Sequence, residues 1–342
     1  MSSMTKRSTI TLLAAAASLA LLTGTAGPAT GTGAKASPMP AAPSAGCGTE
    51  QKPGNDERTI STEDGERSYR INIPRDYEIA TPLPLVLGFH GNGSDGAEFQ
   101  NYTGLPTLPT ITVFPDGDEG DGKRSWQGAP YASGADDVAF VAELLDSIES
   151  EHCIDLNRVY ATGKSNGGGM VSVLACHLRD RFSAFAPVAG AYYPQSTEGC
   201  DYSTPTPMLA IHGTGDATMH FEGGHRQGED YPGVREWIQP WAEASGCTRT
   251  KERQVGRRGE DVVRIQWTRC QTEGGAGSRA VGKSGERSAA VELYSVADGG
   301  HVWPGEVVYS GGGYVTKDFS ATEAVWDFFY SHPGATQGPA QK

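Results

Sequence analysis

Short apolar runs alternate with segments of helical periodicity along most of this chain, and that alternation restricts its fold more than any other feature. The run LPLVLGFHG (83–91) is apolar almost throughout, which is typical of a strand buried on both faces of a parallel sheet. After Asp137, apolar residues recur at helical spacing, and Asp136 or Asp137 can cap that helix. Further strands are expected in TITVFPDG, RVYATG, FSAFAPVAG, MLAIHG and VELYSV, and further helices in GGGMVSVLACHL and SATEAVWDFFYSH. These patterns predict an α/β protein in which helices cover both faces of a mostly parallel sheet.

The two ends of the chain differ in composition from its middle. A basic pair precedes an apolar stretch too short to span a membrane, so residues 1–26 are expected to be a secretory signal peptide, with cleavage as late as Ala36. Residues 27–45 are mostly Ala, Gly, Pro, Ser and Thr and are predicted to be a linker. With no second linker and no internal repeat, we expect a single domain over 46–331 and a tail at 332–342. The protein is expected to be secreted and monomeric.

The charge and the cysteines narrow the class of partner. A formal net charge of −13 at pH 7 argues against nucleic acid or an anionic membrane. Six cysteines in an exported chain favour disulfides over a metal site, since no C-x-x-C or H-x-x-x-H pair occurs. The pairs suggested by position along the chain are Cys247 with Cys270, Cys176 with Cys200, and Cys47 with Cys153. Other pairings stay open, because sequence alone does not choose among them.

Ser165 lies between glycines, where a predicted strand gives way to a predicted helix. The segment GKSNG (163–167) fits G-x-S-x-G, the nucleophile elbow, a sharp turn that exposes a serine hydroxyl above a sheet. A flexible glycine-rich turn without function would show the same letters, but the strand–turn–helix context favours a nucleophile. The N-terminus of the following helix favours developing negative charge, and the N–H of Asn166 is expected to be one oxyanion donor.

A serine hydroxyl needs a base, and the base needs an acid that orients it. In elbow-type hydrolases the chain order is Ser, then Asp or Glu, then His. Asp216 follows the run MLAIHG, and His301 lies on a glycine-rich loop after VELYSV, so both are at carboxyl ends of predicted strands, where such sheets build their sites. Asp298 is a rival acid, although it could be only a turn residue. We expect Ser165, Asp216 and His301 to form a catalytic triad.

Two further sets of residues are candidates for contact with a substrate. The loop HGNGSDG after the first buried run is expected to provide a second oxyanion donor, the N–H of Asn92, since glycines let the backbone approach a ligand closely. Trp126 and Trp303 flank the same region in sequence. Each could line a pocket for the acyl group or pack in the core.

Several of these blocks resemble those of the secreted esterases in carbohydrate esterase family 1, and they are similar to those of polyhydroxybutyrate depolymerase-like esterases. The blocks are GFHG, TVFPDG, HCIDLNRVYATGKSNGGGM, LAC, APVAG, IHGTGD and GGHVWPG. The cysteines in GCG, HCID, LAC, EGC, SGC and TRC look like the pattern of type-D feruloyl esterases. The resemblance implies an α/β-hydrolase fold that uses no metal or organic cofactor. It also implies hydrolysis of feruloyl or other hydroxycinnamoyl esters, either on plant arabinoxylan or in small ester substrates.

The sequence departs from this family pattern at two places, and it leaves alternatives open. Lys164 occupies the variable position of the elbow, where apolar residues are more usual, and it is not expected to affect the chemistry. The long polar stretch 271–290 is expected to alter the rim near His301, which bears on acyl preference. The alternatives are a polyhydroxybutyrate depolymerase or an acetyl esterase on the same fold. A non-catalytic wall-binding protein is a further alternative, and the intact Ser–Asp–His order argues against it.

Overall fold

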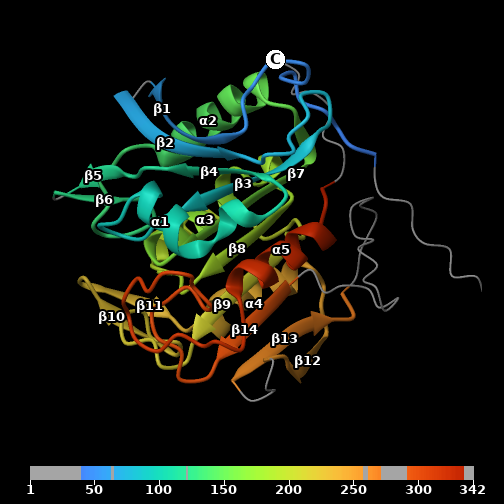
Figure 1. Ribbon diagram of the computed structural model, residues 1–342. Coiled ribbons are helices and arrows are strands. Elements are labelled where there is room, and N and C mark those ends of the chain that lie inside the picture. Colours follow the sequence, from blue (N-terminus) through green and yellow to red (C-terminus); the bar gives the residue numbers. More distant parts are fainter. Residues whose placement is uncertain (1–39, 63–64, 121, 257–260, 271–290, 335–342) are drawn as a thin grey trace, which may run out of the picture. The chain divides into compact units, whose positions relative to one another are not determined.

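A ten-stranded sheet forms the centre of the protein, and its six middle strands are parallel (Figure 1). The computed structural model describes residues 40–334 apart from 63–64, 121, 257–260 and 271–290. The strand order is β1-β2-β4-β3-β7-β8-β9-β14-β13-β12, with antiparallel pairs at both edges. The strands are β1 (Gly54–Thr62), β2 (Gly65–Ile73), β3 (Leu83–Phe89), β4 (Ile111–Pro115), β7 (Ile154–Lys164), β8 (Ala184–Val188), β9 (Met208–Gly213), β12 (Arg249–Gln254), β13 (Val262–Thr268) and β14 (Val291–Val296).

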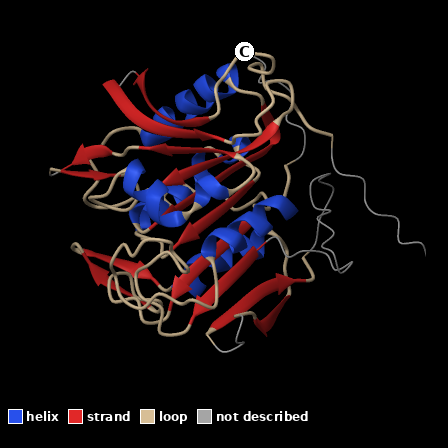
Figure 2. Ribbon diagram, in the orientation of Figure 1, coloured by secondary structure: helices blue, strands red, loops and turns tan. Residues whose placement is uncertain are grey.

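Helices lie on both faces of this sheet (Figure 2). They are α1 (Gly96–Thr103), α2 (Asp137–Glu151), α3 (Asn166–His177), α4 (Val234–Ala244) and α5 (Ala321–Ser331). Apolar side chains of α2, α3 and α4 pack in one buried cluster, and those of α1 and α5 pack in another. The predicted parallel sheet covered by helices on both faces is therefore confirmed.

Side-chain caps fix where two of the predicted helices begin. The Asp136 carboxylate accepts a hydrogen bond from Ala139 N at 2.9 Å, and the Ser320 hydroxyl accepts one from Glu323 N at 3.2 Å. Each cap satisfies a backbone N–H that has no partner within the helix. The smaller elements are two hairpins and three 3₁₀ turns: β5 (Asp118–Gly120) with β6 (Lys123–Ser125), β10 (Gly223–Arg226) with β11 (Glu229–Pro232), and Leu105–Thr107, Arg179–Arg181 and Pro194–Ser196.

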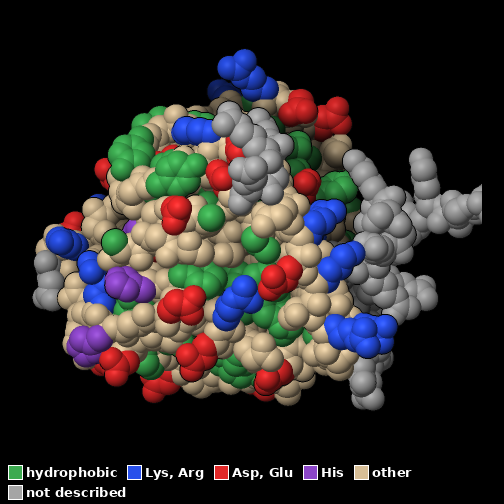
Figure 3. All heavy atoms as spheres, turned by 90° about the horizontal axis from the view of Figure 1, so that it is seen from below, with side chains coloured by type: hydrophobic (Ala, Val, Ile, Leu, Met, Phe, Trp, Pro, Cys, Tyr) green, Lys and Arg blue, Asp and Glu red, His purple; other side chains and the backbone are tan. Residues whose placement is uncertain are grey.

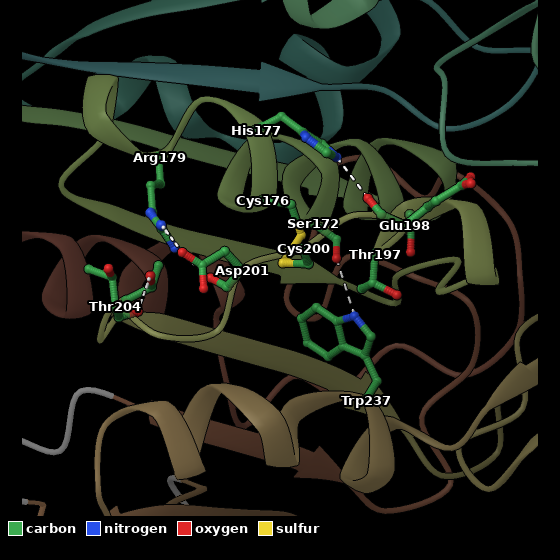
Figure 4. Close-up of a disulfide and its surroundings, with 12 residues drawn as sticks. Ser172, Cys176, His177, Arg179, Thr197, Glu198, Cys200, Asp201, Thr204 and Trp237 are labelled. Carbon is green, nitrogen blue, oxygen red and sulfur yellow. Dashed lines mark hydrogen bonds and ion pairs between the residues drawn. A yellow bond between two sulfur atoms is a disulfide. The ribbon is translucent and has the colours of Figure 1, made fainter.

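Three disulfides hold segments that are distant in the chain. They join Cys47 to Cys153, Cys176 to Cys200, and Cys247 to Cys270, the pairs that their positions suggested. Figure 4 shows how the second of these ties the end of α3 to the loop before β9. Beside it, a ring nitrogen of His177 lies 2.9 Å from Glu198 O, and Trp237 on α4 donates to the Ser172 hydroxyl at 3.2 Å. The disulfide and these hydrogen bonds fasten α3, the helix that follows Ser165, to its surroundings.

The last residues of the predicted linker are packed against the domain. Ala42 N donates to the Asp155 carboxylate at 3.0 Å, and the buried Ser44 hydroxyl donates to His152 O at 2.6 Å and accepts from Ile154 N at 2.9 Å. The end of the predicted linker therefore pairs with the backbone beside β7, which its composition does not indicate.

Parts of the two predicted termini lie outside the described residues. This applies to the signal peptide at 1–26, to 27–39 of the linker and to 335–342 of the tail. The start of the tail is described, and Gly334 N donates to Asn157 O at 2.8 Å. Within the described ranges, no helix is both long enough and apolar enough to cross a membrane.

Candidate active site

Ser165 lies at the sharp turn between β7 and α3, where the G-x-S-x-G pattern places it. Its backbone has φ 59° and ψ −121°, a conformation that costs energy in any residue other than glycine, and its N–H donates to Val188 O at 3.1 Å. The turn has no room for side chains beside the serine. A Cβ on Gly167 would lie 2.1 Å from Phe89 O, and one on Gly163 would lie 2.5 Å from Gly167 O. Close packing therefore requires these glycines, which excludes the interpretation of the segment as a merely flexible turn.

The elbow lies where the strand order of the sheet reverses. From β3 the chain moves to β4 on one side and then to β7 on the other, and β3 and β7 are parallel neighbours with Phe89 opposite Gly163. Such a switch point leaves a crevice outside the carboxyl ends of the two strands. The loop containing Asn92, which follows β3, and Ser165, which follows β7, therefore lie side by side.

Asp216 and His301 meet at the same edge of the sheet. They follow β9 and β14, which are parallel neighbours, and His301 Nδ1 lies 2.8 Å from the Asp216 carboxylate. The other carboxylate oxygen accepts from Thr218 N and Met219 N, both at 2.8 Å. His212 Nε2 lies 3.3 Å from Asp216 and 2.8 Å from Met219 O, so Asp216 lies between two imidazoles.

The surroundings of Asp216 keep it ionised. Burial alone would raise the pKa of the Asp216 carboxyl, but hydrogen bonds from His212 and His301 outweigh burial and bring that pKa well below its usual range. A carboxylate that stays charged can hold one imidazole tautomer and stabilise the imidazolium that forms when the ring takes up a proton. Asp298, the rival acid, is exposed, and its own N–H bonds the Thr214 hydroxyl at 2.9 Å.

His301 is poised to be neutral near pH 7. Burial lowers the pKa of the His301 imidazole most, and the positive charge of Lys164 and the neighbouring His212 lower it further, whereas the hydrogen bond and charge of Asp216 raise it. The net shift is downward, below the ordinary value of about 6.5. A neutral imidazole whose Nδ1–H is bound to a carboxylate has its other nitrogen available as a general base.

Ser165 and His301 line one pocket of about 480 Å³. Its other lining residues come from the loop after β3, from α1, from the end of β7 and from the loop that follows His301: Gly91, Asn92, Gly93, Ser94, Glu98, Asn101, Tyr102, Lys164, Val308, Tyr309 and Ser310. The structure thus brings Ser165, His301 and Asn92 to one cavity, with Asp216 behind the imidazole. In the part of the chain that is described, no group of three or more His, Cys, Asp or Glu side chains could hold a metal ion.

Buried polar contacts hold the two segments that carry the expected oxyanion donors, the loop after β3 and the start of α3. His90 Nε2 accepts from Gly117 N at 2.8 Å, so its Nδ1 carries the proton and donates to Gly91 O at 2.8 Å. The Asn166 side chain binds the backbone of Trp126 in both directions, accepting from its N at 2.7 Å and donating to its O at 3.0 Å. These bonds set the backbone around Asn92 and Asn166 without using the N–H of either residue.

The prediction that Trp126 and Trp303 could form walls of the pocket is corrected by their burial. Both indoles are fully buried and neither lines the cavity. Trp126 donates from Nε1 to His90 O at 3.0 Å, and Trp303 donates to the Thr322 hydroxyl at 2.9 Å. Trp126 therefore supports the loop after β3 from beneath, and both residues belong to the core, the alternative that the sequence left open.

The outer side of the pocket is formed by residues that no sequence pattern marks. Tyr102 and the 308–310 segment carry no motif, and Lys164 stands out in the sequence only as an unusual neighbour of the serine. The predicted effect of 271–290 on the rim concerns residues that lie outside the described residues.

Comparison with known proteins finds feruloyl esterases among the relatives of this chain. The probable feruloyl esterase C of Aspergillus niger is 31% identical over 201 residues, which are 56% of this chain and 68% of that protein. The feruloyl esterase B of Piromyces equi is 30% identical over 193 residues, but this chain spans only 36% of its length. No family model matches the chain.

A solved structure extends the likeness to the fold. The acetyl xylan esterase from Aspergillus awamori superposes with a TM-score of 0.52 at 14% identity, covering 81% of this chain and 99% of that one. At this identity the likeness concerns the fold alone, which is the α/β-hydrolase fold. The chain belongs to the feruloyl esterase family, as its match over two thirds of the Aspergillus niger relative shows.

Proposed function

We propose that this protein is a secreted serine esterase that hydrolyses feruloyl and related hydroxycinnamoyl esters of plant cell-wall polysaccharide through an acyl-enzyme. The observation that carries the proposal is the pocket lined by both Ser165 and His301, with the Asp216 carboxylate 2.8 Å from His301 Nδ1. The feruloyl esterase relatives support the choice of acyl group. The three disulfides support export to an oxidising compartment.

In the proposed mechanism, Ser165 Oγ attacks the ester carbonyl carbon while His301 Nε2 takes the hydroxyl proton. Asp216 holds the imidazole through Nδ1 and stabilises its charged form. The N–H groups of Asn92 and Asn166 donate to the oxyanion of the tetrahedral intermediate. Collapse of this intermediate expels the alcohol, which receives the proton from His301, and leaves an ester between Ser165 and the acyl group. Water then attacks that ester, again with His301 as base, and frees both the acid and Ser165.

The charge of the protein fits an uncharged polysaccharide ester better than a polyanion. The net charge is −13, and Figure 3 shows acidic side chains spread over the face drawn there. A negative surface repels nucleic acids and anionic membranes at long range. The pocket itself presents mainly neutral side chains, apart from Lys164 and the exposed Glu98.

Side-by-side kinetics test the proposal. The mature protein is assayed on methyl ferulate, 4-nitrophenyl acetate and a hydroxybutyrate trimer, and kcat/KM is expected to be highest for methyl ferulate. Ser165→Ala is expected to remove activity on every ester, by a factor on the order of 10⁶ in kcat, while the folded state remains. A folded variant that keeps more than about a tenth of the activity would exclude Ser165 as nucleophile. Preference for the trimer would instead favour the depolymerase alternative.

A further inference from the structure

The loop over residues 306–314, here called the rim loop, forms the outer side of the pocket and exposes a cluster of apolar side chains. Val308 and Tyr309 line the pocket together with Ser165. Among the described residues, the exposed large hydrophobic side chains are Ile79, Val307, Val308, Tyr309, Tyr314 and Tyr330, and four of the six belong to the rim loop. Apolar groups gathered at the mouth of a cavity are typical of a surface that contacts a ligand.

The rim loop is fixed to the loop that carries the general base. His301 N donates to Gly312 O at 2.7 Å, and Gly300 N donates to Tyr314 O at 2.9 Å. Near the start of the rim loop, Val307 N donates to Tyr102 O at 3.0 Å, which ties it to the end of α1. The loop is thus bound at both ends to elements that line the pocket.

A chain of polar groups that runs from buried Glu306 through exposed Ser310 to buried Lys164 joins the same loop to the elbow. The Glu306 carboxylate accepts from Ser310 N at 2.9 Å and from the Ser310 hydroxyl at 2.8 Å, and Glu306 is buried. Lys164, the residue before Ser165, donates from Nζ to the Ser310 hydroxyl oxygen at 3.3 Å, and its ammonium lies 5.3 Å from the centre of the Tyr102 ring. The charge of Glu306 and the ring face of Tyr102 offset part of the cost of burying the Lys164 ammonium, whose pKa burial still lowers on balance.

We infer that Tyr309 and Val308 are specificity-determining contacts for a planar aromatic acyl group, and that Lys164 and Glu306 are positioning residues that hold them at the pocket. This inference rests on the proposed esterase function and names the part of the chain that selects its acyl group. A phenol ring and a branched aliphatic side chain beside the nucleophile offer an apolar wall to a flat ring conjugated to the ester carbonyl. An acetyl group offers only one methyl to such a wall, so it gains little from it.

Substitution of Tyr309 tests the contact. With 4-nitrophenyl ferulate and 4-nitrophenyl acetate the leaving group is the same, so the ratio of their kcat/KM values reports on the acyl group alone. Tyr309→Ala is expected to lower the ferulate-to-acetate ratio a few-fold to about tenfold, the range that one aromatic contact contributes. Tyr309→Phe keeps the ring and is expected to keep the ratio. Tyr330→Ala, which removes a tyrosine of similar exposure from α5, is the matched control.

The positioning role of Lys164 is tested separately, by KM and by the pH profile. Lys164→Met is expected to raise KM for the ferulate ester more than it lowers kcat, and Lys164→Arg is expected to restore KM in part. Because the Lys164 charge lowers the pKa of His301, Lys164→Met is also expected to move the acid limb of the pH profile upward. Lys164→Arg keeps the positive charge and is expected to leave that limb in place, which separates loss of the charge from a packing defect.

Two results would overturn the inference while the esterase function stands. One is a ferulate-to-acetate ratio in Tyr309→Ala equal to that of Tyr330→Ala. The other is an unchanged KM in Lys164→Met. A wild-type protein that hydrolyses neither ester would instead refute the proposed function itself, so the two failures are distinguishable.

Discussion

At the scale of single residues, the proposed mechanism depends on which carboxylate orients His301. Asp216 is bound to Nδ1 of that imidazole at 2.8 Å, and His212 adds a second contact at 3.3 Å. The sequence indicated Asp216 because it follows a strand in the right chain order. It gave no sign of the role of His212, because a histidine within a strand run usually serves packing.

Replacement of each candidate acid gives a matched pair of variants. Asp216→Asn is expected to lower kcat by roughly 10⁴, because an amide favours the wrong imidazole tautomer. Asp298→Asn is the control and is expected to change kcat little, since Asp298 is exposed and contacts Thr214 through its backbone. Steady-state kinetics on methyl ferulate measure both. A large loss in Asp298→Asn with a trivial one in Asp216→Asn would reverse the assignment.

The pH dependence of the reaction reports on His301. The neutral imidazole is the active base, so kcat/KM falls as the pH falls through the pKa of His301 in the free enzyme. Because burial lowers that pKa, the midpoint of the acid limb is expected below about 6.5. The midpoint is measured from a pH profile of kcat/KM, with Ser165→Ala as the blank for uncatalysed hydrolysis. A midpoint above the ordinary histidine value would contradict the described burial of His301.

At the scale of elements, the elbow combines strain and close packing. The backbone of Ser165 departs from ordinary geometry, and α3 approaches β3 so closely that Gly167 has no space for a Cβ. This arrangement explains why a glycine-flanked serine follows a buried strand. The elbow was predictable from the sequence because few other structural settings require a serine between glycines directly after a buried strand.

A methyl group added at the elbow tests this packing. In Gly167→Ala the new Cβ would lie 2.1 Å from the backbone oxygen of Phe89, which cannot move aside as a flexible side chain would. Strain of this kind is expected to lower the free energy of unfolding by about 1–3 kcal/mol and to reduce activity as well. Urea unfolding and kinetics of the same preparation measure the two effects. If Gly167→Ala had both the stability and the rate of the wild type, the elbow would be looser than described.

The central elements were predictable from the sequence, and the edges of the sheet were not. β3, β8 and β9 are buried on both faces, so their runs are almost entirely apolar. All of β12 is exposed, and its residues RTKERQ carry no pattern of burial. The rim loop was missed for a related reason, since hydrogen bonds to distant residues hold it in place and no local motif marks it.

At the scale of the whole molecule, the disulfides close loops of very different length. Cys47 and Cys153 are 106 residues apart, whereas Cys247 and Cys270 are 23 apart. In the chain-entropy model a cross-link stabilises by restricting the unfolded chain, and a longer loop gives more stability. The first disulfide also fastens the segment at 40–47 to the domain.

Paired substitutions compare these two disulfides. Cys47→Ala with Cys153→Ala is expected to lower the free energy of unfolding by about 4–5 kcal/mol, against about 3 kcal/mol for Cys247→Ala with Cys270→Ala. Urea unfolding without reductant measures each loss against wild type. An equal or reversed order would show that native-state contacts, and not loop length, set the contribution of each disulfide.

The central claim is that Ser165 carries the feruloyl group during turnover, and mass spectrometry of the acyl-enzyme tests it most directly. The protein is mixed with 4-nitrophenyl ferulate, quenched in acid within the first turnovers and digested. We expect the mass of a feruloyl group on the peptide that contains Ser165, and no such mass in Ser165→Ala treated in the same way. Hydrolysis by wild type with the feruloyl group on another residue, or a feruloyl group on the corresponding peptide of Ser165→Ala, would contradict this claim.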